Sequence, residues 1–429
     1  MLRVLHIAAH LGGGIGTAYY GIINETYKQG VEIVHSFLLM EDPIELSIIE
    51  NLQKLGVQIS IYRNQKEETQ VLLSTADVVV FNWWHHPSLY RFLIEYDNVS
   101  FRAVIWSHVS GCTYPYINQK LLDLCDKLIL TTPYSYENED MASLDTALTR
   151  RKTEVVYGLG DLSNYISLEK KAHNMFNIGY VGTINFAKIH PDIEAYCAAV
   201  DIEDSIFTFV GRDDISKTLS NQSVLSKMNF VGYSRTPWNY MAQFDIFGYL
   251  LSSTHYGTTE NALLEAMAAG VVPVAMKQNV ERYIIENGVN GFLVESPEEY
   301  GEVLRYLYKH PDTCKKIGQC AQKSILERFS TKINTSKLND ICFEVSSLPK
   351  RKIQFVDTLG YEPFDWFLFG MDSVTQEKML SLSQQIDSTS VLQSLPQIFF
   401  QENKSSILHY HKYYPESKEL AVIHDTIKK

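Results

Sequence analysis

The chain predicts an α/β protein built from two successive doubly wound domains. Short runs of continuously apolar, β-branched residues alternate with longer amphipathic or polar segments. Such runs are typical of parallel strands that helices cover on both faces. The alternation restarts halfway along the chain, and 429 residues are too many for one ordinary core. Both observations favour two sheets over one sheet with an insertion.

The first half opens on an apolar run and a glycine-rich turn, followed by a helix expected over Thr17–Gln29. The segment Glu154–Tyr165 closes this half with a strand and two closely spaced glycines. The other expected strands are Leu2–Ala9, Val31–Leu39, Val57–Tyr62, Asp77–Asn82, Ala103–Ser107 and Lys127–Thr131.

The second half repeats the pattern, with a strong helix expected at about Glu260–Ala269. The polar stretch Asp161–Asn177 carries no strong strand signal, so we expect domains at residues 1–165 and 166–345. The expected strands are Asn177–Val181, Phe207–Gly211, Asn229–Val231, Asp245–Leu250, Val272–Ala275 and Phe292–Val294.

The remaining residues, 346–429, differ in character because many aromatic side chains stand among polar ones. We expect a mostly helical C-terminal extension that packs these aromatics onto the domains. The alternative is that the extension is a surface for an acceptor molecule or a partner protein.

Composition narrows the classes of function. A formal net charge of -12 argues against a broad nucleic-acid footprint, although a lysine and a helix N-terminus can still hold an anion. Six scattered cysteines without a CxxC pair fit a reducing compartment and favour no metal site. The first apolar run is too short for a signal peptide, and no stretch is long enough to span a bilayer. We therefore expect a cytoplasmic protein, with peripheral contact at the inner membrane face left open.

The loop His10–Tyr20 directly follows the first expected strand. Its glycines let backbone N–H groups approach a ligand, and the next helix offers its positive end. A dinucleotide-binding G-x-G-x-x-G pattern lacks its third glycine here. Counted from Gly12 or Gly14, that position holds Thr17 or Tyr19. This disfavours hydride transfer without excluding it.

His108 comes directly after the expected strand Ala103–Ser107. A residue at the carboxyl end of a parallel strand points into the ligand crevice, although a satisfied buried histidine fits equally well. His85 and His86 occupy a similar place after another strand, but the side chains of adjacent residues diverge and do not form a metal site alone.

The most informative segment is His255–Met276, where a polar, glycine-containing turn leads into a run of strong helix formers. Thr258 or Thr259 is expected to cap this helix through its hydroxyl. The free N–H groups of the first turn then suit a diphosphate.

Asn261 and Glu265 are four residues apart and so share one helix face, whereas Glu260 points away from Glu265. A carboxylate one turn into such a helix can accept two ribose hydroxyls. The alternative is a solvated surface glutamate, which is common for this residue type.

These motifs resemble the retaining, GT-B-fold nucleotide-sugar glycosyltransferases of the large group-1 family. The resemblance covers about Met1–Val345 and is looser in the first half, where the glycine loop, His108 and Val155–Leu162 carry it. The closer stretches are Tyr180–Ile193, Phe207–Arg212, Val231–Leu251, His255–Met276 and Glu286–Ser296.

The resemblance implies two Rossmann-like domains that face each other across a cleft, and it implies roles for particular residues. His108 would contact the donor sugar, Lys188 would grip the diphosphate, and Glu265 would bind the ribose; these three form the expected catalytic set. The expected donor-binding set is Gly13, Gly14, Ile15, Gly182, Thr183, Lys188, Arg212, Thr258, Thr259, Glu260, Asn261, Ala262 and Glu265.

Three positions depart from the family pattern. Thr183 replaces the arginine of a G-R-x4-K motif that ends at Lys188. Gly257 stands where the first acid of an E-x7-E motif touches the donor sugar, so another residue must substitute or sugar recognition must differ. Glu260 stands where the family often has glycine, and we expect it to turn outward or to meet a sugar hydroxyl.

The resemblance implies that a sugar passes with retention from a nucleotide-sugar, UDP- or GDP-linked, to a hydroxyl of a glycan, a lipid-linked acceptor or a protein. No cofactor and no metal are expected. The alternative is a catalytically silent relative that serves as a binding or scaffold subunit for a partner glycosyltransferase. Epimerases and phosphorylases share the fold class, but a phosphorylase needs a cofactor lysine site that the sequence does not show.

Overall fold

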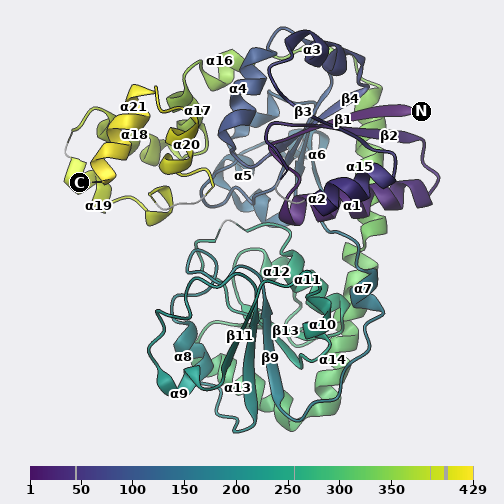
Figure 1. Cartoon of the computed structure of the whole chain (residues 1–429), viewed down its shortest axis with the longest axis vertical. Helices are drawn as coiled ribbons and strands as arrows, with labels where there is room; N and C mark the ends of the chain where they lie inside the picture. The colour runs from purple at the N-terminus through teal and green to yellow at the C-terminus, as the bar shows by residue number, and fades with distance from the viewer. Residues whose placement is uncertain (44–45, 256, 387, 401–403, 429) are drawn as a thin grey trace. The chain divides into compact units, whose positions relative to one another are not determined.

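The computed structural model describes residues 1–43, 46–255, 257–386, 388–400 and 404–428. The chain forms two compact units (Figure 1). Unit 1 comprises Met1–Gly158 and Asn334–Lys429, and unit 2 comprises Leu159–Ile333. The chain therefore leaves unit 1, completes unit 2 and returns to unit 1.

Unit 1 contains a seven-stranded parallel sheet in the order β3-β2-β1-β4-β6-β7-β8. Its buried strands are nearly continuous runs of Val, Ile, Leu and Phe, which explains why the sequence pattern found them. The strand bounds are β1 Leu2–Ala8, β2 Ile33–Leu39, β3 Gln58–Ile61, β4 Val78–Trp83, β6 Ala103–Ser107, β7 Lys127–Leu130 and β8 Thr153–Val155.

Helices cover both faces of this sheet. The helix expected from Thr17 begins earlier, since α1 spans Gly13–Lys28 with Gly12 as its N-cap. The glycines that the sequence placed in a loop therefore lie at the first turn of the helix. The other helices of this region include α2 Leu46–Lys54, α3 Lys66–Thr75, α4 Pro87–Glu95, α5 Glu139–Ala142 and α6 Thr146–Lys152.

Helix α15, Thr331–Ser346, carries the chain back into unit 1. Its apolar residues Leu338, Ile341, Cys342 and Val345 are buried in the same core as strand β1. Residues 334–345 were expected in the second domain, but this packing places them in unit 1, and residues 159–165 lie in unit 2.

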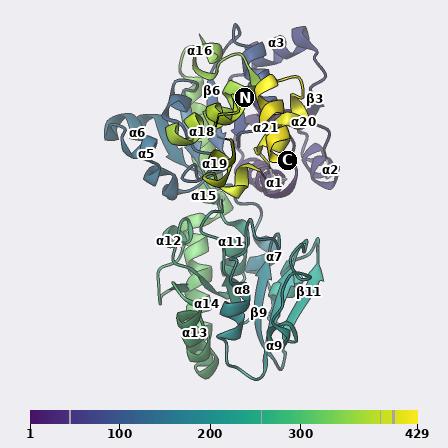
Figure 2. The ribbon, with the colours of Figure 1, turned by 90° about the vertical axis from the view of Figure 1, so that its left-hand side faces the viewer.

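The C-terminal extension is mostly helical, as expected (Figure 2). It packs on α4 of unit 1 through α16, α17 and α20 (Figure 1). Phe367 and Tyr410 are fully buried in the core that contains Trp83 of β4. A short strand, β15 Arg351–Lys352, pairs antiparallel with β5 Ser100–Phe101. The helices are α16 Phe355–Leu359, α17 Pro363–Phe369, α18 Ser373–Ser383, α19 Ser388–Gln393, α20 Ile407–Tyr413 and α21 Lys418–Ile427.

A polar contact also ties the extension to unit 1. Glu41, just after β2, accepts hydrogen bonds from the Tyr413 hydroxyl of α20 and from His86 Nε2, which lies 2.9 Å away. His86 Nδ1 accepts from Ser88, so the Nε2 nitrogen carries the proton. The extension thus reaches the carboxyl ends of β2 and β4.

Unit 2 contains a six-stranded parallel sheet in the order β11-β10-β9-β12-β13-β14. Helix α11, Asn261–Ala268, packs on β12, β13 and α14, and α13 packs on α8. The strands are β9 Phe176–Val181, β10 Ser205–Val210, β11 Met228–Gly232, β12 Ile246–Tyr249, β13 Val272–Met276 and β14 Phe292–Val294. The helices include α7 Ser163–Ile166, α8 Ile193–Ala198, α9 Gln222–Leu225, α10 Trp238–Met241, α12 Glu281–Ile284, α13 Pro297–Lys309 and α14 Pro311–Ser324.

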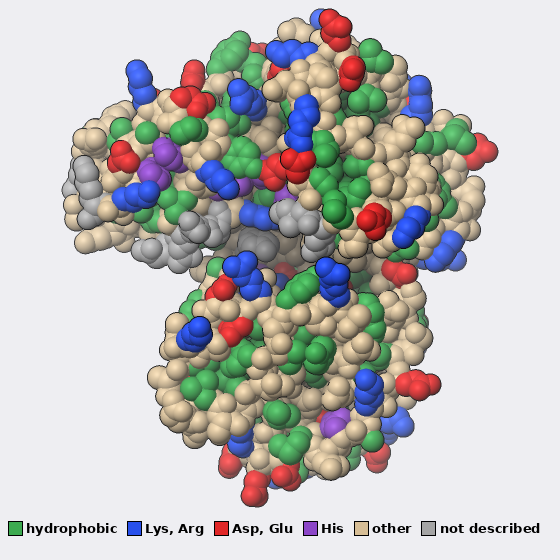
Figure 3. Space-filling view, viewed as in Figure 1, with side chains coloured by type: hydrophobic (Ala, Val, Ile, Leu, Met, Phe, Trp, Pro, Cys, Tyr) green, Lys and Arg blue, Asp and Glu red, His purple; other side chains and the backbone are tan. Residues whose placement is uncertain are grey.

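Acidic and basic side chains are interspersed on the face of the molecule seen in Figure 3. In the described part of the chain, no helix combines the length and apolar character needed to cross a membrane.

We predict that Phe367→Ala lowers the free energy of unfolding of unit 1 by about 3 to 5 kcal/mol, because the ring is fully buried and its removal leaves a cavity. Urea unfolding followed by circular dichroism measures this change. Tyr361→Ala, in the same extension but with a 69% exposed ring, is the control and should change stability by less than about 0.5 kcal/mol. Equal effects of the two substitutions would mean that the extension does not contribute to the core.

Candidate functional site

The candidate site in unit 2 is built around the N-terminus of α11. Glu260 is the N-cap residue and has left-handed backbone angles, φ 56° and ψ 55°. Its carbonyl accepts the N–H groups of Leu263 and Leu264, so the amides of Asn261 and Ala262 have no intrahelical partner. The expected hydroxyl cap is wrong: Thr258 instead accepts the Glu260 N–H at 3.4 Å, and Thr259 is buried beside it.

Glu260 turns inward, so the expectation that it turns outward is wrong. The alternative expectation, that it meets a sugar hydroxyl, stays a prediction. The Glu260 side chain is 2% exposed, with one carboxylate oxygen accepting the Thr258 N–H at 2.9 Å and the other accepting the Tyr249 hydroxyl. Sequence spacing could not predict this, because the partner Tyr249 lies on another element, strand β12. Burial alone would raise the pKa of Glu260, but the positive charge of Lys188, the His255 contact and the Tyr249 hydrogen bond outweigh it and hold this pKa far below its usual value.

Lys188 is placed by a loop that follows β9. The loop is pinned at both ends, because Ile184 bridges to Asp213 and Ile189 bridges to Leu251. Lys188 Nζ lies 3.9 Å from a Glu260 carboxylate oxygen and 5.8 Å from the centre of the Tyr249 ring. The structure thus brings Lys188 to the N-terminus of α11, and its side chain remains 26% exposed.

Glu265 lies one turn into α11 and accepts the Tyr165 hydroxyl at 2.9 Å. Burial raises the pKa of Glu265 to about 7, although the Tyr165 hydrogen bond and the positive charge of Lys188 oppose this rise. On the same helix face, Asn261 Oδ1 is buried with no hydrogen-bond partner among the described residues. The shared face that the sequence predicted therefore carries two polar groups with capacity for a ligand.

Two further ionisable residues adjoin Glu260, and the sequence reasoning did not assign them a role. His255 Nε2 lies 3.5 Å from Glu260 Oε1 and 3.9 Å from Glu281 Oε1. Burial raises the pKa of Glu281 to about 8, and the two carboxylates raise the pKa of His255 against the effect of its burial. Glu281 lies on α12, and no spacing rule links it to α11. Tyr256, between His255 and Gly257, lies outside the described residues.

The glycine turn after β9 holds the other expected donor residues. Gly182 lies against Gly211 at the end of β10, and a Cβ on Gly211 would come within 1.8 Å of the Gly182 carbonyl. Thr183 is exposed, and its carbonyl accepts the Tyr180 hydroxyl. The Arg212 side chain is 83% exposed and lies 3.8 Å from Asp214. Among the described residues, no hydrogen bond or ion pair joins it to the side chains at the N-terminus of α11.

In unit 1, the first turn of α1 directly follows β1. Gly13 and Gly14 are exposed there, Ile15 is partly buried, and the Gly12 N–H donates to His10 Nδ1 at 3.1 Å. The N-terminus of a helix that follows a parallel strand is suited to an anion. The structure thus places the three expected residues at one helix end.

His108 lies directly after β6, as expected, and its Nε2 is 2.7 Å from Asn82 Oδ1 at the end of β4. Burial lowers the pKa of His108 to about 3, so the ring is neutral. The sequence did not assign Asn82 a role, although its place beside His85 and His86 at a strand end pointed to the same crevice.

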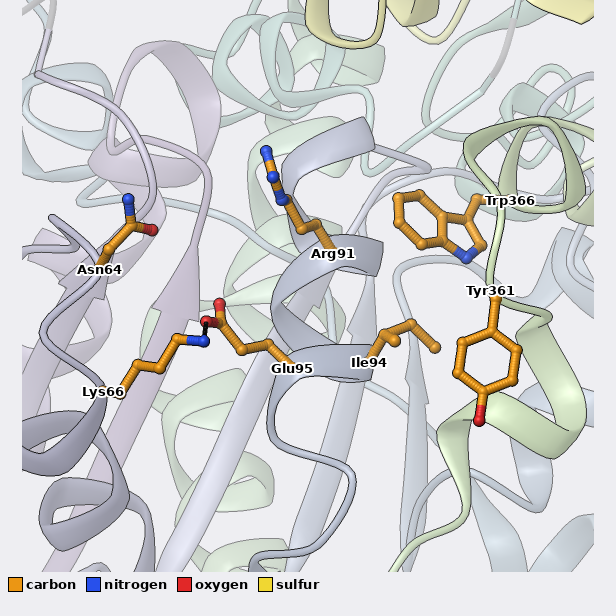
Figure 4. A pocket seen from close by; sticks show the side chains of 7 residues that line it. All are labelled: Asn64, Lys66, Arg91, Ile94, Glu95, Tyr361 and Trp366. Atoms are coloured by element: carbon orange, nitrogen blue, oxygen red, sulfur yellow. Dashed lines mark ion pairs between the residues drawn. The ribbon is translucent and has the colours of Figure 1, made fainter. Parts of the chain in front are cut away.

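Unit 1 also contains two adjoining grooves, of about 450 and 330 Å³, that share Asn64, Arg91 and Glu95. Figure 4 shows Arg91 and Glu95 on α4, with Trp366 and Tyr361 of the extension beside them. Lys66 Nζ pairs with Glu95 at 2.9 Å. None of the expected donor-site residues lines either groove.

Residues 175–310 match the family model described as glycosyl transferases group 1. A stretch of 81 residues is 35% identical to the putative glycosyltransferase EpsD of Bacillus subtilis, which covers 18% of this chain. That match spans 21% of the relative's length.

Solved structures similar to this chain cover most of it. HepE of Anabaena, solved in complex with UDP, matches with a TM-score of 0.65 and 16% identity over 80% of this chain and 100% of that chain. A glycosyltransferase from Rickettsia africae matches with a TM-score of 0.65 and 15% identity, over 81% and 99%. The pneumococcal O-GlcNAc transferase GtfA, in complex with UDP and GlcNAc, matches with a TM-score of 0.60 and 12% identity, over 81% and 99%. These similarities confirm the GT-B fold.

We predict that the stability of unit 2 falls as the pH rises from about 5 to about 8. Folded Glu265, with a pKa of about 7, keeps a proton that the unfolded chain releases near pH 4.5, so folding is favoured less as the proton is lost. Glu265→Gln should reduce this decline by up to about 2 kcal/mol, and Glu281 should maintain the rest. Urea unfolding of the unchanged protein and of Glu265→Gln at several pH values measures how the free energy of unfolding declines with pH.

The control for this prediction is Glu295→Gln, since Glu295 is 66% exposed on the surface of unit 2. It should leave the pH dependence as in the unchanged protein. An unaltered slope in Glu265→Gln would show that Glu265 ionises normally in the folded state.

Proposed function

Residues 175–310 form a domain of the group 1 glycosyl transferases within a GT-B fold, and from this we propose that the chain transfers a sugar from a nucleotide-sugar donor to an acceptor hydroxyl. The observation that carries the proposal is the cluster in unit 2. There Lys188, the free amides at the α11 N-terminus and Glu265 lie on neighbouring elements.

The cluster suits the chemistry of a departing nucleotide diphosphate. Negative charge grows on the diphosphate as the sugar leaves, and the Lys188 ammonium and the α11 amides offer preorganised positive potential. Glu260 keeps Lys188 in place before the donor binds. A diphosphate of higher charge then competes with the single Glu260 carboxylate for the ammonium.

We propose that Glu265 accepts the ribose hydroxyls of the nucleotide. Its carboxyl is held by Tyr165 and lies one turn from the amides that would hold the diphosphate, which is the order of groups along a nucleoside diphosphate. A ribose that donates two hydrogen bonds stabilises the ionised form, so its binding lowers the Glu265 pKa from about 7.

We propose UDP as the nucleotide, since similar structures are complexes with UDP, with UDP-glucose and with UDP and GlcNAc. Retention of the anomeric configuration and independence from metal are part of the proposal and follow the family resemblance. The acceptor class is a glycan, a lipid-linked sugar or a protein. A cytoplasmic location, peripheral at the inner membrane face, stays a prediction from the sequence.

We predict that UDP, without added metal, raises the melting temperature of the protein, whereas GDP, ADP and TDP do so less. UDP at about a hundred times its dissociation constant stabilises by about 2.7 kcal/mol. Glu265→Ala and Lys188→Ala should each abolish the shift, and Glu295→Ala, a surface control, should keep it. No shift with any nucleotide would contradict the proposal and favour a silent scaffold subunit.

We predict that donor turnover persists in excess EDTA, because the diphosphate charge is balanced by Lys188 and helix amides. UDP release from UDP-glucose, with and without EDTA and with and without Mg²⁺, measures this. Activity that disappears with EDTA and returns with Mg²⁺ would refute metal independence and leave the transferase proposal intact.

We predict that the transferred sugar keeps the anomeric configuration of the donor. Proton NMR of the product formed before mutarotation shows which anomer appears first. An inverted product would overturn the proposed stereochemistry.

A further inference from the structure

A continuous chain of buried hydrogen bonds in unit 1 begins at His108. Its Nε2 lies 2.7 Å from Asn82 Oδ1, and the Tyr19 hydroxyl donates to the same oxygen at 2.8 Å. Beyond Tyr19, His6 Nδ1 lies 3.1 Å from the Tyr19 oxygen, and His6 Nε2 lies 2.9 Å from His35 Nδ1. All these groups are on strands β1, β2 and β4, on helix α1, or directly after β6.

The orientation of the Asn82 amide is fixed by a separate contact. Its Nδ2 donates to the Ile7 carbonyl at 3.1 Å, and a carbonyl can only accept. The other amide atom, Oδ1, is therefore the acceptor that faces His108 and Tyr19. Because an amide oxygen cannot donate, His108 must carry its proton on Nε2.

The same logic assigns the rest of the chain. The Tyr19 hydroxyl donates its only proton to Asn82, so the Tyr19 oxygen accepts a hydrogen bond from His6 Nδ1–H. His6 Nε2 then accepts a hydrogen bond from His35 Nδ1–H. Both histidines are neutral in this arrangement, and burial, the largest cause, lowers the pKa of each. A single pattern of protons satisfies every link.

The opposite ring nitrogen of His108 is left for a ligand. Nδ1 has no hydrogen-bond partner among the residues that the structure describes, and the His108 residue is only half-buried. With the proton on Nε2, Nδ1 presents a lone pair and can only accept.

We propose that Asn82 is a positioning residue that holds His108 as the Nε2–H tautomer, so that Nδ1 accepts a hydrogen bond from a hydroxyl of the bound sugar. The tautomer set by Asn82 is a property of the free protein, whereas the contact of His108 with the sugar is the one that the family resemblance implies and rests on the proposed function. His108 is then a specificity-determining residue: it favours a hydroxyl over a fluorine or a hydrogen at the contacted carbon, because only the hydroxyl can donate to it.

Imidazole NMR of ¹⁵N-histidine-labelled protein, without any ligand, tests the tautomer. One of the 13 histidine spin systems should disappear in His108→Gln, and in the unchanged protein it should show the Nε2–H pattern. Asn82→Leu should turn this signal into a mixture of the two neutral tautomers. Tyr19→Phe is the matched control, because it removes the next link and leaves the bond between Asn82 and His108; the Nε2–H pattern should persist.

Asn82→Asp keeps the result decisive if the leucine variant does not fold. A carboxylate in place of the amide favours a charged ring, so the His108 signal should move toward the doubly protonated pattern at neutral pH. An Nδ1–H signal in the unchanged protein, or a signal that neither substitution alters, overturns the role of Asn82.

Deoxyfluoro analogues of UDP-glucose, altered at one carbon at a time, test the sugar contact. At the contacted carbon, fluorine should weaken binding to the unchanged protein on the order of tenfold and should have no further effect in His108→Ala. Equal losses in both proteins at every carbon overturn the contact. Failure of UDP-glucose itself to bind counts against the proposed donor instead, and the ligand-free NMR spectra still decide the role of Asn82.

Discussion

The pair of partly exposed Lys188 and buried Glu260 is the interaction on which the candidate site of unit 2 depends. Glu260 occupies a left-handed backbone conformation that costs a residue with a side chain about 1 to 3 kcal/mol. The surroundings offset this cost, because Tyr249, the Thr258 amide, His255 and Lys188 all contact one carboxylate. This set of contacts determines both where helix α11 begins and where the Lys188 ammonium lies.

Groups of both charge signs surround this pair. Lys188 and His255 face Glu260, and Glu281 stays protonated over a wider pH range than a free glutamate because its pKa is about 8. A second buried negative charge beside Glu260 would repel it, and protonation of Glu281 avoids this repulsion. Gly257 stands at the position of the first acid of the family motif and adds no charge. The carboxylate nearest to it in the chain is that of Glu260, which is buried within unit 2.

Most of the sheets could be predicted from the sequence, because parallel strands buried on both faces are unmistakable apolar runs such as Val78–Trp83. The sequence also identified the elements that bear Lys188 and Glu265. It could not predict that Glu260 turns inward or that Asn82 faces His108. Each contact joins residues from two different elements: Glu260 with Tyr249 of β12, and His108 with Asn82 of β4. The helix spacing rules describe neighbours on one element and carry no information about such contacts.

The two units bury different kinds of polar group: charged side chains in unit 2 and neutral ones in unit 1. This difference suits a nucleotide-sugar, which has a charged diphosphate and a neutral sugar. Unit 2 buries charged groups around Lys188 and Glu260, which suits a ligand group that is itself charged, such as a diphosphate. Unit 1 buries a neutral chain that ends at His108, with each proton assigned by its acceptor. A neutral ring with one lone pair discriminates between hydroxyls without attracting phosphate, because it has no net charge.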